Sequence, residues 1–140
     1  MNHALVPTVP LFAGVKRRRR LELAALADEI EVPAGTALTR EGTPAQEFFV
    51  ILDGEADVVT RRLSPPPGSH APTKLATLGP GDFFGEIGLV NGVERSATVA
   101  AVTPMRLLVV GPREFGWLMH AFPHVAERIR AACVARSAHR

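Results

Sequence analysis

The sequence predicts a mainly β domain flanked by helices, and three features support that prediction. Between residues 32 and 111 the chain is a series of short runs rich in valine, isoleucine and phenylalanine, separated by turn signals, as is typical of an antiparallel barrel or sandwich. Before and after this region, apolar residues recur at helical spacing. The chain has 140 residues, of which 46% are hydrophobic and 21% charged. It is therefore long enough to form one domain with a buried core.

A helix is predicted over residues 18–29, ahead of the β-rich region. From Leu23 to Ile30 the apolar residues fall at positions i, i+3, i+4 and i+7, which places them on one helix face. We therefore expect residues 11–31 to be helical. Five consecutive basic residues, KRRRR at 16–20, lie where this helix begins. Because the whole chain carries a net charge of +2, the remainder is net negative, and the basic character is one local patch rather than a surface that coats nucleic acid.

This basic patch has two interpretations. As a solvated face, it is offset by nearby acidic residues such as Glu22 and Asp28. This interpretation is favoured because runs of charge are usually solvated. As a functional surface, the patch would dock an acidic partner protein or an anionic membrane.

The segment EFFVILDGEADVVTRR, residues 47–62, gives the clearest strand signal. Two runs rich in valine, isoleucine and phenylalanine flank Asp53 and Gly54. This dipeptide supplies the positive φ angles of a tight turn. The segment therefore predicts two strands joined in a β-hairpin.

The rest of the β-rich region follows in three pieces. Residues 63–73, LSPPPGSHAPT, are polar and rich in proline, which excludes them from a sheet interior and predicts an exposed loop between two strands. Residues 74–84 return to strand character around a Gly-Pro-Gly turn. Residues 96–111 predict two more short strands, broken at Thr103 and Pro104.

Two helices are predicted at the C-terminal end, over residues 112–138. Gly111 and Pro112 form a helix-start signal, because proline is favoured at the first helical position. Pro123 then interrupts the helix. The apolar residues that line one face of the last helix are Val125, Ile129, Ala132 and Cys133.

The sequence also argues against several classes of function. His120 and His124 are four residues apart, but Pro123 breaks the helix that they would share, so no metal site is predicted. The chain has no dinucleotide or Walker motif and no order of residues that suggests a catalytic triad, so neither an enzyme nor a bound cofactor is predicted. The single cysteine, Cys133, the lack of a signal-peptide pattern and the lack of a long apolar run predict a cytoplasmic chain without a transmembrane segment.

One segment, FFGEIGLVNGVERSATVAA at residues 83–101, places charges in an otherwise apolar and glycine-spaced sequence. An isolated buried charge is costly, so Glu86 and Arg95 each need a partner. One explanation is that they pair with each other and fix a loop. The other is that both face a ligand. The ligand is favoured, because a simple ion pair does not require three glycines in the same segment.

A ligand with a phosphate group and a sugar hydroxyl would satisfy both charges. Gly85 and Gly88 let backbone N–H groups approach an anion closely. Arg95 can hold a phosphate through two parallel hydrogen bonds, and Ser96 adds a hydroxyl donor beside it. Because a carboxylate repels phosphate, we expect Glu86 to meet a hydroxyl group elsewhere on the same molecule.

The same segment, extended to GDFFGEIGLVNGVERSATVAA, resembles the phosphate-binding cassette of the cyclic nucleotide-binding domain family. The family pattern is approximately F-G-E-[LI]-[AG]-L, a short spacer, and R-[STA]-A-[TS]-V. Three further segments resemble the family in its order: PLFAGV, VPAGTALTREGTPAQEFFVILDGEADV and LGPGDFFGE. The ending FPHVAERI is similar to the last helix of the domains of bacterial cyclic nucleotide-gated channels. The family also includes the domains of the catabolite activator protein and of protein kinase A regulatory subunits.

The resemblance implies an antiparallel eight-stranded β-roll, jelly-roll-like, with an N-terminal helix and C-terminal lid helices. The roll would span residues 32–111, with the cassette at 83–99, in a single domain. A cyclic nucleotide would lie inside it. The ligand-binding residues that the resemblance implies are Phe84, Gly85, Glu86, Ile87, Gly88, Arg95, Ser96, Ala97 and Arg130.

The resemblance also implies a role for each of these residues. Glu86 would hold the ribose 2′-hydroxyl, while Arg95 and Ser96 would hold the cyclic phosphate. Phe84 would form part of the apolar wall. Arg130 would lean over the base from the last helix. The backbone groups that would assist with the phosphate belong to Gly85, Ile87 and Ala97.

Two positions depart from the family pattern. Glu94 stands where many members have proline, and its carboxylate would weaken phosphate binding. The order ERSA nevertheless resembles that of the catabolite activator protein, so binding is expected to be retained. Gly88 stands where alanine is common, at little expected cost.

From the resemblance we expect a non-catalytic regulatory domain that binds a cyclic nucleotide, with cAMP favoured over cGMP, and signals by moving its C-terminal helices. No helix-turn-helix follows the last helix, so we expect a separate downstream partner, or a chain that is a fragment. Two alternatives stay open. One is a β-roll interaction module that has lost nucleotide binding, which Glu94 and the basic patch would favour. The other is the sensor part of a transcription regulator, truncated before its DNA-binding module.

Overall fold

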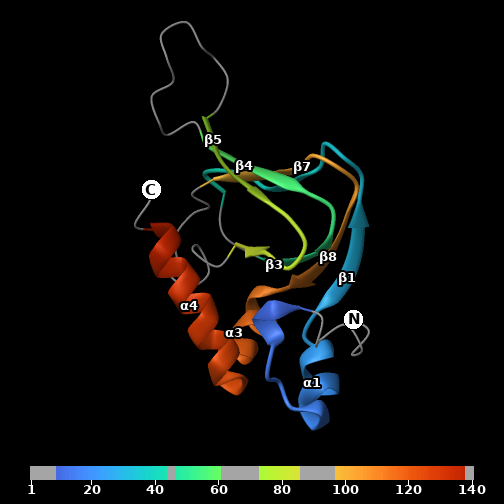
Figure 1. The fold of residues 1–140 in the computed structure, drawn as a ribbon, viewed down its shortest axis with the longest axis vertical. Helices are drawn as coiled ribbons and strands as arrows, with labels where there is room; N and C mark the ends of the chain where they lie inside the picture. The colour runs from blue at the N-terminus through green and yellow to red at the C-terminus, as the bar shows by residue number, and fades with distance from the viewer. Residues whose placement is uncertain (1–8, 44–46, 61–72, 86–96, 138–140) are drawn as a thin grey trace, which may run out of the picture.

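Two antiparallel sheets face each other above a group of helices in the computed structural model of the protein, which describes residues 9–43, 47–60, 73–85 and 97–137 (Figure 1). Each sheet has four strands. The helices lie together at one end of the two sheets. The predicted fold class, mainly β with an eight-stranded roll and flanking helices, is therefore confirmed.

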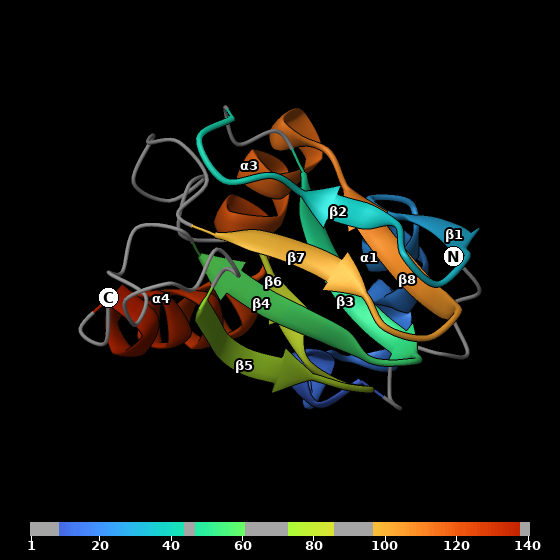
Figure 2. The ribbon, with the colours of Figure 1, turned by 90° about the horizontal axis from the view of Figure 1, so that it is seen from above.

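The first sheet has the order β1-β8-β3-β6, and the second has the order β2-β7-β4-β5. Figure 2 shows the strands of the second sheet side by side, in front of those of the first. All the strand pairs are antiparallel. The strands of the first sheet are β1 (Asp28–Val32), β8 (Met105–Val110), β3 (Phe48–Asp53) and β6 (Phe83–Phe84). Those of the second are β2 (Ala37–Thr39), β7 (Thr98–Ala101), β4 (Ala56–Thr60) and β5 (Thr73–Leu78).

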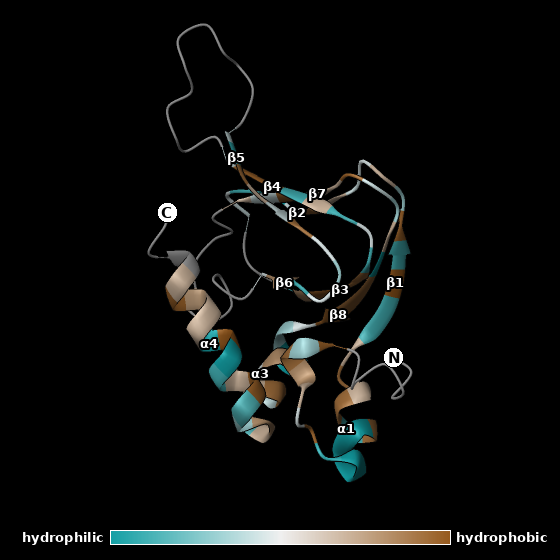
Figure 3. Cartoon of the chain, viewed as in Figure 1, coloured by the Kyte–Doolittle hydropathy of each residue, from teal (hydrophilic) through white to brown (hydrophobic). Residues whose placement is uncertain are grey.

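The two central strands of the first sheet, β8 and β3, are largely buried on both faces. From β8, Met105 and Leu107 join an inner cluster between the two sheets, whereas Leu108 and Val110 join a second cluster beneath the helices. Because successive side chains of a strand point to opposite faces, a strand covered on both sides has to be apolar throughout. Figure 3 accordingly shows β8 as hydrophobic along most of its length. The two clusters are joined through this sheet, which carries the helices on one side and the roll interior on the other.

The predicted helix over residues 18–29, and with it the helical region expected at 11–31, is wrong in extent. The α-helix α1 covers only Arg20–Ala24, after the short 3-10 helices η2 (Pro10–Phe12) and η3 (Arg17–Arg19). The roll begins at β1, ahead of its expected start at residue 32. Ile30, assigned to the helix face by spacing, instead pairs with Leu107 and packs on the inner cluster. The exposed edge of β8 thus gains a partner strand, and this tertiary pairing overrides the helical spacing.

The predicted hairpin around Gly54 is also wrong. Strand β3 pairs with β6 and β8, while β4 pairs with β5 and β7, so the two strands belong to different sheets. The turn itself is present, and Gly54 has a φ of +95°. It crosses from one sheet to the other and is fixed by the neighbouring β7–β8 connection, where the amide of Val102 donates to the carbonyl oxygen of Glu55 at 2.9 Å. The amide of Glu55 in turn donates to Oγ1 of Thr103 at 3.0 Å.

The C-terminal helices are those that the sequence predicts. They are α3 (Pro112–Ala121), with proline in its first turn, and α4 (Pro123–Ser137). Val125, Ile129 and Cys133 are all buried on one face of α4. The predicted β5–β6 turn and the break between β7 and β8 are also confirmed. Most of the predicted proline-rich loop, residues 63–73, lies outside the described residues.

None of the helices that the structure describes combines the length and the apolar character that crossing a lipid bilayer requires.

Candidate functional site

The structure describes both ends of the predicted phosphate-binding cassette. Phe84 and Gly85 lie at its beginning, Ala97 lies at its end, and Arg130 lies on α4. The predicted site residues that fall in residues 86–96, outside the described part of the chain, are Glu86, Ile87, Gly88, Arg95 and Ser96, together with the neighbouring Glu94 and Leu89.

Phe84 anchors the beginning of the cassette in the first sheet. It pairs with Phe49 across β6 and β3, and the two rings stack with their centroids 4.8 Å apart. The side chain of Phe84 is 3% exposed. Gly85 follows with a φ of +96°, a conformation that only glycine adopts without strain. A buried aromatic residue and a glycine turn therefore fix the position from which the chain leaves the sheet towards Glu86.

Ala97 anchors the other end of the cassette in the second sheet. It is 6% exposed, and its carbonyl oxygen accepts a hydrogen bond from Oγ1 of Thr39 at 3.3 Å. The same hydroxyl accepts from the amide of Val99 at 3.1 Å. Phe84 and Ala97 both belong to the inner cluster between the sheets. The two ends of residues 86–96 are thus tied to opposite sheets, on either side of the roll interior.

Threonine side chains near the end of the cassette form a polar group that sequence reasoning missed. Thr39 and Thr60 are the buried polar residues among those that the structure describes. Thr60 Oγ1 donates to the carboxylate of Glu41, and the amide of Glu41 donates to Oγ1 of Thr98 at 2.9 Å. Hydrogen bonding allows a polar group to be buried without loss of stability. The sequence feature that could have indicated this group is threonine at inward-facing strand positions. A search for hydrophobic residues alone overlooks it.

Arg130 lies on the exposed face of α4. Its neighbour Ile129 is fully buried, so Arg130 lies beside the helix face that packs on the domain. Within the described residues, the Arg130 side chain makes no hydrogen bond or ion pair. Figure 1 shows α4 rising from the helical end alongside the sheets. The structure therefore places the Arg130 cation on a helix beside the roll. Within the described residues it has no hydrogen bond or ion pair that would connect it to Phe84 or Ala97.

The two histidines at helical spacing lie on separate helices, His120 on α3 and His124 on α4. Across the part of the chain that the structure describes, no three histidine, cysteine or acidic side chains gather in a way that could hold a metal ion.

Comparison with known proteins places this architecture among the cyclic nucleotide-binding folds. The sequence profile of the family described as "Cyclic nucleotide-binding domain" matches residues 29–122, about two thirds of the chain. A cyclic nucleotide-gated potassium channel of Mesorhizobium japonicum is 35% identical over 96% of the chain. A cAMP-dependent protein kinase regulatory subunit of Aspergillus fumigatus is 30% identical over 91% of the chain.

The solved structure of the catabolite activator protein of Thermus thermophilus superposes with a TM-score of 0.75. It is 28% identical, and the match covers 93% of this chain and 58% of that one. The chain spans 35% of the length of the Mesorhizobium channel and 29% of that of the Aspergillus subunit. The similarity therefore concerns one domain of each of these relatives.

Proposed function

The chain belongs to the cyclic nucleotide-binding domain family, and on this premise we propose that it is a non-catalytic regulatory domain that senses a cyclic nucleotide. The observation that carries the proposal is the anchoring of the cassette. Gly85, in its positive-φ turn, directly precedes Glu86, and the buried Ala97 directly follows Ser96. The charged and hydroxyl side chains needed to hold a sugar phosphate are thus carried on a segment whose ends are tied to both sheets.

In the proposed complex, Arg95 binds the cyclic phosphate through two parallel hydrogen bonds and Ser96 donates a third. Glu86 accepts a hydrogen bond from the ribose 2′-hydroxyl. Phe84 supports the apolar wall, as its stacking on Phe49 at the edge of the inner cluster allows. The remaining contacts that we propose come from the backbone of Gly85, Ile87 and Ala97, with Gly88 leaving room for the ligand.

We favour cAMP as the ligand, because the Aspergillus relative is named for its dependence on cAMP. Binding neutralises Arg95 and satisfies Glu86, which favours the conformation in which both face the roll interior. Arg130, free of partners within the described residues, then closes over the base and draws α4 with it. The ligand thereby shifts the population towards a closed state, and α4 passes the shift to a downstream partner. A cytoplasmic location agrees with the single cysteine of the chain.

A thermal-shift titration with cAMP and with cGMP tests the proposal, on wild-type protein and on Arg95→Ala. A ligand at a hundred times its Kd adds about 2.7 kcal/mol to the free energy of unfolding. We expect this stabilisation in the wild type and its loss in Arg95→Ala, since the phosphate then has no guanidinium partner.

Arg113→Ala is the matched control, because Arg113 is an exposed arginine on α3, outside the cassette. It should keep the full response to nucleotide. A folded wild-type protein that shows no shift at millimolar cAMP or cGMP would reject the sensor and favour an interaction module.

A further inference from the structure

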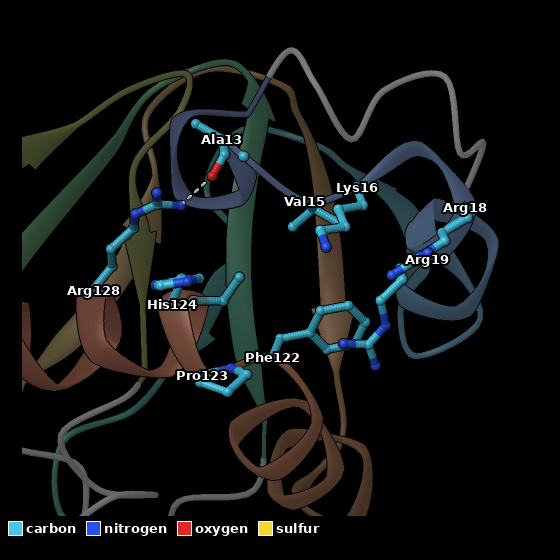
Figure 4. Close-up of a pocket in the computed structure, with 11 residues that line it drawn as sticks. Ala13, Val15, Lys16, Arg18, Arg19, Phe122, Pro123, His124 and Arg128 are labelled. Atoms are coloured by element: carbon cyan, nitrogen blue, oxygen red, sulfur yellow. Dashed lines mark hydrogen bonds between the residues drawn. The ribbon is translucent and has the colours of Figure 1, made fainter.

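A hollow lies at the helical end of the molecule, with a volume of about 480 Å³. Its walls come from two segments: residues 13–16, 18 and 19 on one side, and residues 122–125 and 128 on the other. Figure 4 shows these two walls facing each other, with the connection between α3 and α4 as the floor. Neither Phe84, Gly85 nor Ala97 lines it, so this pocket is separate from the described ends of the cassette. Its volume is in the range of sites for small molecules.

The pocket is strongly basic. Five of its lining residues are lysine, arginine or histidine, and none is acidic. Two of these residues, Arg19 and Arg128, hold the walls of the pocket together through hydrogen bonds. Arg128 Nη1 donates to the carbonyl oxygens of Leu11 at 2.8 Å and Ala13 at 2.6 Å. These carbonyls fix the guanidinium of Arg128 but do not neutralise it.

Arg19 has an acidic partner outside the pocket. Its guanidinium forms two hydrogen bonds with the carboxylate of Glu22, at 3.1 and 3.0 Å, and they hold the pKa of Glu22 below its ordinary value. The same guanidinium lies 4.2 Å from the ring centroid of Phe122 and donates to the carbonyl oxygen of Ala121 at 2.8 Å. Arg19 thus links the N-terminal segment to the end of α3, and its charge is compensated locally.

Lys16 and Arg18 are not compensated in this way. Both are exposed, and within the described residues neither has an ion-pair partner. Figure 4 shows the Lys16 side chain directed from the upper wall into the space above Phe122. Together with Arg128 they place three positive charges around one hollow, with no counter-charge among its lining residues. Like charges held close together repel, and a bound anion relieves that repulsion.

The start of α4 adds hydrogen-bond donors to the same wall. Pro123 has no N–H group, and the amides of His124 and Val125 have no acceptor among the described residues. The amide of Ala126 is the first that bonds back, to the carbonyl oxygen of Phe122 at 2.9 Å. The positive end of this 15-residue helix therefore adjoins the pocket.

We propose that this pocket is a second ligand site, which binds a small organic phosphate independently of the nucleotide. Lys16, Arg18 and the start of α4 bind the phosphate group, since ammonium, guanidinium and helix amides all favour that anion. Val15 and the edge of Phe122 contact the organic part. The bound phosphate bridges the N-terminal segment and α4, and so stabilises their contact.

The experiment is an NMR titration of the full chain with sodium pyrophosphate, followed through the backbone amides, with sodium citrate as the carboxylate probe. We expect saturable shifts at residues 13–18 and 124–128, and weaker binding of citrate. Arg18→Gln should raise the Kd for pyrophosphate by about fivefold. Arg17→Gln is the matched control, because Arg17 is the adjacent exposed arginine of η3 and does not line the pocket. It should change the Kd by less than about twofold.

Three results would overturn the proposal. The first is no saturable binding of pyrophosphate up to about 10 mM, where even weak sites fill. The second is an equal loss in Arg17→Gln and Arg18→Gln, which would assign binding to the charge of the whole basic patch. The third is a set of shifts confined to the ends of the cassette, or tighter binding of citrate. No nucleotide is present in these samples, so the outcome is independent of the proposed sensing of cAMP.

Discussion

Gly54 lies at a position that tolerates a side chain poorly. Its φ is +95°, and a Cβ there would lie 2.5 Å from the carbonyl oxygen of Pro104 and 2.8 Å from Cγ of Met105. We predict that Gly54→Ala lowers the free energy of unfolding by more than about 2 kcal/mol, because strain in the backbone and a steric clash act together. Urea denaturation measures the change.

Gly116→Ala is the matched control for this prediction. Gly116 lies inside α3, and a Cβ there would meet nothing within 4 Å. Alanine is favoured over glycine in a helix, so this variant should be more stable by about 0.5–1 kcal/mol. Equal effects of the two substitutions would contradict the account of the Gly54 turn.

Single residues of the candidate site were predictable to different degrees. Glu86 and Arg95 stand out in the sequence because charges in an apolar segment need partners. The threonines Thr39 and Thr60 do not stand out, because threonine is common on strands and its burial depends on which strands meet. Residues with unusual chemistry for their surroundings can therefore be proposed as ligand contacts from the sequence, whereas those made unusual by the fold were missed.

Two adjacent residues of helix α4, Ile129 and Arg130, are predicted to have different roles, the first in stability and the second in ligand binding. Ile129 is fully buried in the cluster beneath the helices, whereas Arg130 is exposed. We predict that Ile129→Ala lowers the free energy of unfolding by about 2–5 kcal/mol through the cavity it leaves. Arg130→Ala should change it by less than about 0.5 kcal/mol. Chemical denaturation of both variants checks this division.

For cAMP binding, Arg130→Ala is the informative variant of that pair. If Arg130 closes over the base, its loss should raise the Kd for cAMP by about fivefold. Arg113→Ala, on the neighbouring helix, should leave the Kd unchanged. An unchanged Kd in Arg130→Ala would remove α4 from the binding site and leave the cassette alone as the ligand contact.

At the level of helices and strands, the sequence predicted the type of element better than its partners. Proline at residues 112 and 123 marks the starts of α3 and α4, because its effect on the backbone is local. The helix predicted to residue 29 instead ends at Ala24, since β8 recruits residues 28–32 as a neighbouring strand. The prediction of a hairpin at Gly54 was wrong for the same reason. A turn is encoded locally, but which strands pair is decided by the whole sheet.

In the molecule as a whole, the two sites that we propose for anions lie in separate places. One is the cassette, tied to both sheets through Phe84 and Ala97. The other is the basic pocket between the N-terminal segment and α4. The strand pattern predicts a barrel or sandwich, whereas the eight-stranded roll follows from the resemblance to the family. The pocket could not be predicted from the sequence, because its two walls are about a hundred residues apart and meet only in the folded chain.

The central claim is that one cyclic nucleotide binds to the cassette of each chain. Isothermal titration calorimetry with cAMP, on wild-type protein and on Arg95→Ala, tests it most directly. We expect saturable binding of one cAMP per chain, and a Kd at least about tenfold higher when the arginine is removed. Folded wild-type protein that gives no binding heat at millimolar cAMP, or an Arg95→Ala variant that binds as tightly as the wild type, would contradict it.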